Sequence, residues 1–427
     1  MPNMLYIGID LSDKFFDSCI TNSQGVVLST KRFDLSHDGF CSFIKLVHEH
    51  EVNEHEAHKE AHKEAHEKDS PKCIIGLENP RSRLVDFLAG RGYTVMQTNP
   101  NAISSYRKSI KPSKAKSDKA DAKLIADYLR EHHASLRRIQ IADETMRELS
   151  LLLEDRDKLV KQKVRFSNQL ISTLKEYFPQ ALDAFGSIDN KCTIKFLKKV
   201  DNYAQLKALS AKKLEQLLKE CGVYRTDSKE RFYQAIRKPV YHISGAVVKT
   251  KTRLKNTLVT HLDLLLQQIQ EYETQIHNLI DDSPNGHIFM SLPGADYILA
   301  AKILVLYSTR DFTDACEAQQ LFGTAPYTAA SGQSRYVGFR RGANKLGRNT
   351  FQQFAKCSIN KSNWAKKQYV RRCNQGKGSQ HSYRCLANTW VKITFAMWRS
   401  KTTYDENRHM ASITNHIVNQ PAFVNGD

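Results

Sequence analysis

Four carboxylates in the first third of the chain stand where a metal site can form. Asp10 ends a short apolar run near the N-terminus, and Glu78 ends a second one, IIGLE. Asp118 and Asp121 open a helical pattern, and their three-residue spacing puts both on one face of that helix. If the two apolar runs are neighbouring parallel strands, their acids project from the same edge of a sheet. Four carboxylates that converge there repel one another unless divalent cations lie between them.

Oxygen ligands of this kind select Mg²⁺ or Mn²⁺. Two such ions about 3.5–4 Å apart can activate a nucleophile and stabilise the leaving oxygen of a phosphodiester. We therefore predict two Mg²⁺ ions, with Mn²⁺ as the alternative, bound by Asp10, Glu78, Asp118 and Asp121. The simpler interpretation of each acid alone is a strand end or a helix cap. An ATPase of the actin or sugar-kinase type also begins with GID, but it needs glycine-rich phosphate loops, which the sequence lacks.

Basic side chains cluster around the start of the helix that carries the acid pair. They are Arg107, Lys108, Lys111, Lys114, Lys116 and Lys119. Because phosphates attract such side chains whatever the base sequence, the cluster predicts a DNA backbone beside the acids.

A serine in the last third of the chain is a candidate nucleophile. Ser331 precedes Gly332 in a short loop of small residues. The polar residues that follow it are Arg335, Arg340, Arg341, Asn344 and Arg348. A serine hydroxyl needs a base or a metal to take its proton, and a ring of arginines can hold the scissile phosphate. Spacing alone leaves open an ordinary Ser-Gly turn, and it leaves Ser334 as a competing nucleophile.

The elements that must position the acids have the pattern of a mixed α/β sheet of the RNase H type. The predicted strands are 4–10, 15–21, 26–33, 73–77 and 93–98. The predicted helices between them are 36–48 and 82–90. We place this first domain at residues 1–142.

A biased insert, EHEAHKEAHKEAHEKD, occupies residues 54–69 of that domain. On a helix His58, His62 and His66 would form one stripe, which could bind a metal. The favoured interpretation is a solvated, charged helix that protrudes from the domain, because the repeat consists of good helix formers.

Two long helical patterns define the middle of the chain, residues 143–285. They cover 143–178 and 244–281, and the leucine spacing in the second predicts an antiparallel coiled-coil hairpin. Residues 180–243 between them form a small helical insert, and the breaker SPNG marks the next boundary.

The last domain, predicted at 286–410, is mainly helical and strongly basic, and 411–427 form a tail. The segment 291–307 has the pattern of a helix-hairpin-helix turn, whose backbone amides can bind a phosphate. From Ala318 to Tyr404 there is no Asp or Glu, but there are sixteen Lys and Arg. With a formal charge of +19 for the whole chain, this domain predicts a polyanionic partner, and nucleic acid is the usual one.

The cysteines and the hydropathy favour a cytoplasmic protein without a membrane partner. The nine cysteines are scattered and contain no Cys-x-x-Cys pair, which argues against disulfides and a structural zinc site. The start of the chain lacks the pattern of a signal peptide, and no apolar run approaches the roughly 20 residues that span a bilayer.

Several segments together resemble a known family. GIDLSDK, GLENPRSRLVDFLAGRGYTVMQTNP and KSDKADAKLIADYL are similar to the DEDD transposase domain of a large bacterial insertion-sequence family, whose relatives include the Piv site-specific DNA invertases. PGADYILAAKIL, FGTAPYTAASGQSR and RRGAN resemble its second domain, in the branch with an Arg-rich, Ala-Asn-containing stretch. The resemblance covers most of residues 4–130 and 287–405.

This resemblance implies a RuvC-like fold in which Asp10, Glu78, Asp118 and Asp121 bind metal and Ser331 is the nucleophile. It implies that the serine forms a covalent 5′-phosphoserine with DNA and leaves a free 3′-hydroxyl. It further implies a structured bridge RNA that pairs with donor and target DNA, and a homo-tetramer built as a dimer of dimers. Such an enzyme is cytoplasmic in a bacterium and associates with the nucleoid when it is bound to DNA.

Two other functions stay open at this point. A RuvC-like Holliday-junction resolvase or nuclease would use the same acids with water as the nucleophile. A non-catalytic RNA- or DNA-binding protein would use only the basic surfaces.

Overall fold

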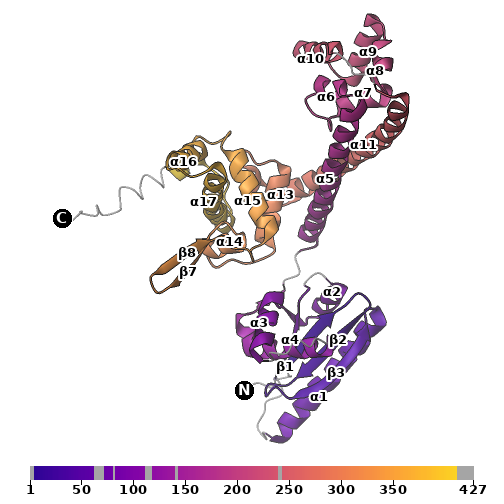
Figure 1. Cartoon of the computed structure of the whole chain (residues 1–427). Coiled ribbons are helices and arrows are strands. Elements are labelled where there is room, and N and C mark those ends of the chain that lie inside the picture. Colours follow the sequence, from indigo (N-terminus) through magenta and orange to yellow (C-terminus); the bar gives the residue numbers. More distant parts are fainter. Residues whose placement is uncertain are drawn as a thin grey trace, which may run out of the picture. The chain divides into compact units, whose positions relative to one another are not determined.

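The computed structural model describes residues 4–61, 72–79, 82–110, 118–139, 143–238 and 243–410. The chain divides into two compact units, Met1–Ile141 and Ala142–Asp427 (Figure 1). The first unit is a mixed α/β domain and the second is mostly helical, which confirms the predicted fold class at this level.

A six-stranded mixed sheet forms the centre of the first unit, in the order β3-β2-β1-β4-β5-β6. Its strands are β1 (Met4–Leu11), β2 (Phe15–Thr21), β3 (Val27–Asp34), β4 (Lys72–Leu77), β5 (Thr94–Gln97) and β6 (Arg137–Arg138). β1 pairs antiparallel with β2 and parallel with β4, so the predicted parallel neighbours are confirmed. Each of the five predicted strands lies within one residue of an observed one at either end.

Helices cover both faces of this sheet. They are α1 (His37–Ala61), α2 (Arg83–Ala89), α3 (Pro100–Ile110), α4 (Asp118–His132) and the short η1 (His133–Ser135). Alternate residues of β1 point to opposite faces. Leu5, Ile7 and Ile9 pack against buried side chains of α1 and α2, whereas Gly8 contacts α4 on the other face. Asp10 shares the face of Gly8, and the alternation therefore turns it toward α4.

The first helix is longer than the sequence pattern predicts. The predicted range ends at 48, but α1 continues to Ala61 and thus enters the His-rich insert. The side chains of that insert, including His58, His62 and His66, lie outside the described residues.

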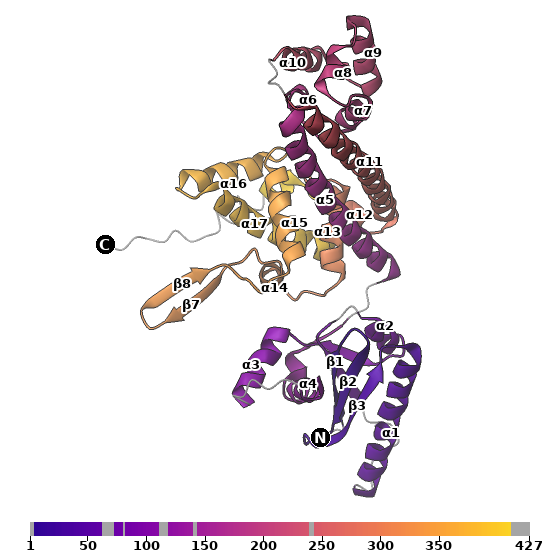
Figure 2. The ribbon, with the colours of Figure 1, turned by 45° about the vertical axis from the view of Figure 1, so that its right-hand side comes forward.

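Two long helices, α5 (Glu144–Tyr177) and α11 (Gly245–Asp282), lie side by side in the second unit (Figures 1 and 2). The chain between them forms a small helical insert with its own hydrophobic core. Its helices are α6 (Gln180–Ala184), α7 (Lys191–Lys199), α8 (Tyr203–Lys207), α9 (Ala211–Cys221) and α10 (Thr226–Arg237). The helical pair agrees with the sequence, and knobs-into-holes coiled-coil packing stays a prediction.

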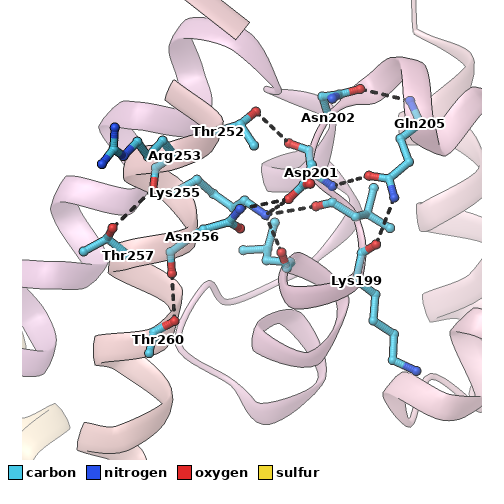
Figure 3. A network of polar contacts seen from close by, with 12 residues as sticks. Lys199, Asp201, Asn202, Gln205, Thr252, Arg253, Lys255, Asn256, Thr257 and Thr260 are labelled. Carbon is cyan, nitrogen blue, oxygen red and sulfur yellow. Dashed lines mark hydrogen bonds and ion pairs between the residues drawn. The ribbon is translucent and has the colours of Figure 1, made fainter. Parts of the chain in front are cut away.

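A buried lysine fastens the insert to α11 (Figure 3). The Lys255 side chain is fully buried, and its ammonium donates to the carbonyl oxygens of Leu197 and Val200 at 2.5 and 3.3 Å. It also binds Asp201 Oδ1 at 2.9 Å. Burial lowers the pKa of Lys255, and the carboxylate opposes that shift. Because these carbonyls end α7, the cation also meets the negative end of that helix dipole.

The rest of the second unit surrounds the apolar helix α13 (Tyr297–Ser308), which is buried almost throughout. Around it stand α12 (Gly286–Met290), α14 (Ala315–Leu321), α15 (Lys345–Ser358), α16 (Asn363–Asn374) and α17 (Ser379–Ser400). The hairpin of β7 (Tyr327–Ser331) and β8 (Ser334–Gly338) forms a separate sheet. The same core includes residues of α5 and α11, and Lys302 of α13 binds Asp157 of α5 at 2.7 Å.

The turn between α12 and α13 is tightly packed. Gly294 has φ +84°, and a Cβ there would lie 2.8 Å from the carbonyl oxygen of Cys357. Glycine is therefore required for both conformation and space. Phosphate binding by this turn, expected of a helix-hairpin-helix motif, stays a prediction. In the described part of the chain, no helix has the length and apolarity that a bilayer crossing requires.

Candidate active site

The pairing of β1 with β4 brings the first two acids to one level of the sheet. Ile9 pairs with Leu77, and Gly8 with Gly76, in a parallel register. Asp10 and Glu78 each follow that last pair by one residue. Since neighbouring parallel strands keep their register, the two acids stand at the same edge of the sheet.

The glycine pair lets α4 approach this sheet closely. A Cβ on Gly8 would lie 2.1 Å from the carbonyl oxygen of Ala122, and one on Gly76 would lie 3.2 Å from the Leu129 side chain. No larger residue fits at Gly8, because the atom that it meets belongs to the helix backbone. The motifs Gly-x-Asp in β1 and Gly-x-Glu after β4 therefore carry a packing role as well as a carboxylate.

α4 supplies the second pair of acids from its first turn. Asp118 and Asp121 open the helix, and Ala122, Ile125 and further apolar residues on the same face are buried. The structure describes this helix from Asp118 onward, and residues 111–117 before it lie outside the described residues.

The pKa of Asp10 indicates that the other three acids lie near it. The pKa of Asp10 is raised to about 6, first by burial and then by the nearby charges of Asp121, Asp118, Glu78 and Asp17. Together with the register of β1 and β4 and the packing of α4 on Gly8, this brings acids from positions 10 to 121 to one part of the sheet. A divalent cation would relieve the repulsion that raises this pKa.

Two arginines already engage the acids of α4. Arg32 of β3 donates from Nη2 to Asp118 Oδ2 at 3.0 Å and to Asp17 Oδ2 at 2.7 Å. Arg107 of α3 donates from Nη2 to Asp121 Oδ1 at 2.5 Å. The sequence predicted Arg107 as a DNA contact. In the structure its guanidinium faces an acid of the cluster, and the DNA contact stays a prediction.

Asp17 and Arg32 were not anticipated from the sequence. Asp17 is fully buried and pairs directly with Asp10 across β1 and β2. Arg32 lies over the ring of Phe15, with 3.8 Å between the guanidinium carbon and the ring centre. The alternation of residues in β2 could have indicated Asp17. It places this acid on the same face of the sheet as Asp10, where an apolar residue would otherwise be expected.

The cluster has the right donors for a divalent metal. All four side chains offer carboxylate oxygens, which suit hard cations such as Mg²⁺. Within the described ranges, no three Asp, Glu, His or Cys side chains are arranged to hold a metal ion as they stand. Since Asp118 and Asp121 each bind an arginine, metal ligation by both would require their carboxylates to share or exchange these partners.

The predicted basic cluster beside α4 is only partly described. Lys108 and Lys119 are exposed, at the end of α3 and the start of α4. Lys111, Lys114 and Lys116 lie outside the described residues. Their contact with DNA stays a prediction.

Ser331 ends β7 at the turn of an exposed hairpin. The sequence indicated a loop, but the structure pairs Ser331 with Ser334 across a two-residue turn. Gly332 has φ +56°, which a tight hairpin with glycine at its first turn position requires. The hydroxyls of both serines are on exposed residues, so the structure leaves each accessible to a phosphate.

The polar residues after Ser331 divide into two groups. Arg335 is exposed on β8, and Arg341 is exposed beyond the hairpin. Arg348 instead donates to the Arg340 carbonyl oxygen at 2.5 Å, and Asn344 caps α15 by accepting from the amide of residue 347 at 3.1 Å. The structure therefore gives Asn344 a capping role and Arg348 a backbone contact that the sequence did not predict.

Comparisons with known proteins agree across both units. A family model described as a transposase, DEDD_Tnp_IS110, matches residues 7–179. A second model, described as the transposase IS116/IS110/IS902 family, matches residues 286–370. All four acids lie in the first match and Ser331 lies in the second.

Two curated relatives from Streptomyces coelicolor are similar over long stretches. The mini-circle putative transposase for IS117 is 25% identical over 417 residues, which cover 96% of this chain and 97% of the relative. The uncharacterized 43.6 kDa protein of insertion element IS110 is 26% identical over 299 residues, which cover 69% of this chain and 73% of that protein. The similarity to the first of these relatives therefore extends over both units of the chain, in the same order along the sequence.

Proposed function

The chain belongs to the IS110/IS116 family of transposases, enzymes that cut and join DNA, and from this premise we propose that it acts through Ser331 and four metal-binding acids. The observation that carries the proposal is the clustering of Asp121, Asp118 and Glu78 around Asp10, whose pKa they raise. A half-buried acid with three further acids near it is typical of a site that holds cations.

Asp10, Glu78, Asp118 and Asp121 would hold two Mg²⁺ ions, with Mn²⁺ as the alternative. Metal bound there would lower the pKa of an attacking hydroxyl and offset the negative charge of a leaving oxygen. Arg32 and Arg107 would orient two of the four carboxylates, because each contacts one oxygen and leaves the other available.

Ser331 is the proposed nucleophile. Its Oγ attacks the phosphorus of a DNA phosphodiester, an Oγ–P bond forms, and the bond from phosphorus to the 3′ oxygen breaks. The serine proton ends on that 3′ oxygen, which leaves a free 3′-hydroxyl and a 5′-phosphoserine. In rejoining, a 3′-hydroxyl attacks the phosphoserine and the serine oxygen leaves. Each step exchanges one phosphodiester for another, so no ATP is needed.

The exposure of Ser331 supports this role, since a nucleophile at an open hairpin turn can reach a phosphate of duplex DNA. Arg335 on the adjacent strand can hold that phosphate and stabilise its transition-state charge. The remaining predicted contacts, Arg340, Arg341, Asn344 and Arg348, lie at or beyond the base of the hairpin.

We extend the proposal to the partners that the sequence motifs imply. A bridge RNA pairs with donor and target DNA, and a homo-tetramer, a dimer of dimers, completes each site from the two domains of different subunits. The formal charge of +19 supports a large nucleic-acid partner. The enzyme works in the bacterial cytoplasm and joins the nucleoid when it binds DNA.

A nuclease that uses water is the second candidate. It is favoured by one observation: the four acids form their cluster entirely within the first unit, without Ser331. Such an enzyme would need the second unit only to bind the substrate.

The decisive experiment traps the covalent intermediate. Full-length protein with Mg²⁺, the transposon-end DNA and the RNA expressed from its own locus is quenched in detergent, and the protein–DNA adduct is measured on a gel. We expect an adduct in the wild type and in Ser334→Ala, and none in Ser331→Ala. Cutting by Ser331→Ala at the wild-type rate would establish the nuclease instead.

A further inference from the structure

Six cations cluster on α16, α17 and the turn between them. They are Lys366, Lys367, Arg371, Arg372, Lys377 and Arg384, and we call this set the α16–α17 cationic surface. Four of them are exposed and two are half-buried. None forms an ion pair with a carboxylate among the described residues. The reason lies in the sequence, because the whole span from Ala318 to Tyr404 contains no acid.

The helical insert of the same unit is also rich in lysine, but several of its lysines form ion pairs with carboxylates. Lys198 binds Asp263 at 2.5 Å, and Lys238 binds Asp183 at 2.8 Å. Further ion pairs there join Lys199 to Glu220 and Lys229 to Glu215. Basic composition alone therefore does not distinguish the two regions, whereas the presence of carboxylate partners does.

The uncompensated charge affects a neighbouring histidine. Burial lowers the pKa of His381, and the positive charges of Lys377, Arg384 and Arg372 lower it further. These three cations therefore lie close enough to His381 to oppose its protonation, and they add to a positive surface there. A polyanion is the partner that such a surface attracts most strongly.

One cation of this surface, Arg384, lies next to the base of the serine hairpin. Phe339 follows β8 directly, is 42% exposed, and lies under the guanidinium of Arg384 at 5.9 Å and that of Arg348 at 4.1 Å. On the other side, the rings of Tyr369 and Tyr383 stack at 4.9 Å and hold α16 against α17. The helix that carries Lys366, Lys367 and Arg371 thus packs directly against the helix that carries Arg384.

We propose that the α16–α17 cationic surface binds the phosphate backbone of the duplex DNA on which Ser331 acts. The surface neutralises phosphates on one side of Phe339 while the hairpin stands on the other. The choice of DNA as ligand rests on the proposed function, because Arg384 of this surface lies next to the base of the hairpin that carries Ser331. The basis for a polyanion, by contrast, is the unpaired charge itself.

Salt dependence of binding tests this proposal directly. The full chain is titrated with a labelled DNA duplex of unrelated sequence, and with an RNA duplex of equal length, at several salt concentrations. The variant removes three exposed cations of α16 by Lys366→Ala, Lys367→Ala and Arg371→Ala. The matched control also removes three charges, by Lys198→Ala, Lys199→Ala and Lys229→Ala, at lysines that already have carboxylate partners.

For three lost phosphate contacts, the slope of log affinity against log salt should become shallower by about 2–3, and DNA affinity should fall about tenfold or more. The control should keep the wild-type slope. A loss on DNA, with or without a loss on RNA, supports the proposal. A loss on RNA alone, on neither duplex, or to the same extent in the control overturns it.

Folding and chemistry are separated by two further measurements. Thermal melting checks the triple variant, and the single charge reversal Lys367→Glu repeats the titration if the triple variant is unfolded. Adduct formation is measured independently in the wild type. If the wild type forms the adduct but the triple variant keeps the wild-type salt slope, only the proposed DNA-binding surface is wrong. If the triple variant has a shallower slope but the wild type forms no adduct, only the proposed serine chemistry is wrong.

Discussion

The acid cluster and the serine hairpin are held by the fold in opposite ways. Asp10 lies on the central strand β1, between β2 and β4 and under α4. Ser331 ends a five-residue strand whose residues are all exposed, in a sheet of only two strands. The acid cluster is therefore part of a packed sheet, whereas Ser331 lies on a hairpin whose β7 residues are exposed.

The difference follows from the charges involved. Carboxylates repel one another, so the fold must force them together with strand register, close helix packing and two arginines. A neutral serine needs no such force, but its hydroxyl is inert until another group takes its proton. We infer that the fold preorganises the acid cluster, whereas the serine depends on a base or a metal that approaches its hydroxyl.

The largest effects are expected from removing the two kinds of reactive group. Asp10→Asn and Ser331→Ala should each reduce strand cleavage by about 10³-fold or more, as losses of central catalytic groups do. Their effects on stability should differ. Asp10→Asn removes a repelled charge and should raise the melting temperature, whereas Ser331→Ala should leave it unchanged, as measured by calorimetry.

These two variants also test the comparison itself. If Asp10→Asn lowered the melting temperature, the cluster would be held together by attraction and not against repulsion. Ser334→Ala is the control for the hairpin, because it removes a neighbouring hydroxyl that is also exposed.

The next effect concerns the arginine that supports the cluster. Arg32→Ala should weaken Mn²⁺ binding by about 10–100-fold, since partners of a ligating carboxylate orient it for the metal. Arg32→Lys should restore only part of the affinity, because an ammonium cannot contact Asp17 and Asp118 with the planar fork of a guanidinium. Calorimetric titration with Mn²⁺ measures this without DNA.

Lys31→Ala serves as its control, because it removes an exposed charge from the same strand. Tighter Mn²⁺ binding in Arg32→Ala would mean that the arginine competes with the metal, and it would contradict an orienting role.

A smaller effect is expected from the glycine that admits α4. Gly8→Ala puts a Cβ within 2.1 Å of a helix carbonyl and should destabilise the first unit by about 1–3 kcal/mol. Metal affinity should fall with it, because α4 carries Asp118 and Asp121. Gly342→Ala, beyond the hairpin, meets no atom within 4 Å and should cost almost nothing. Urea unfolding compares the two, and equal losses would refute the contrast between a packed and an open region.

The smallest effect is expected at Asn344, where two variants distinguish a helix cap from a DNA contact. Asn344→Ala should lower stability by about 1 kcal/mol, because it removes the cap of α15. Asn344→Ser should restore stability, since serine is also a good cap. DNA binding that stayed low in the stable serine variant would show that Asn344 contacts DNA, as the sequence predicted.

Much of the first unit could be predicted because its signals are local. Short apolar runs ending in acids predicted β1 and β4, and the three-residue step predicted that Asp118 and Asp121 share a helix face. Hydrophobic alternation and capping residues act over a few positions, so they are visible in one sequence. The hairpin was harder, since a Ser-Gly turn occurs equally in an irregular loop.

The sequence by itself determined which acids and which serine are candidates, the order of the elements, and the strong positive charge of the last domain. Only the tertiary structure decided that Asp17 and Arg32 join the acids, that Arg107 faces Asp121, and that Ser331 stands on an exposed hairpin. It also decided which lysines have carboxylate partners. The physical reason is that charges interact through space, and residues as distant as Arg32 and Asp118 become neighbours only after β3 and α4 have packed on the same sheet.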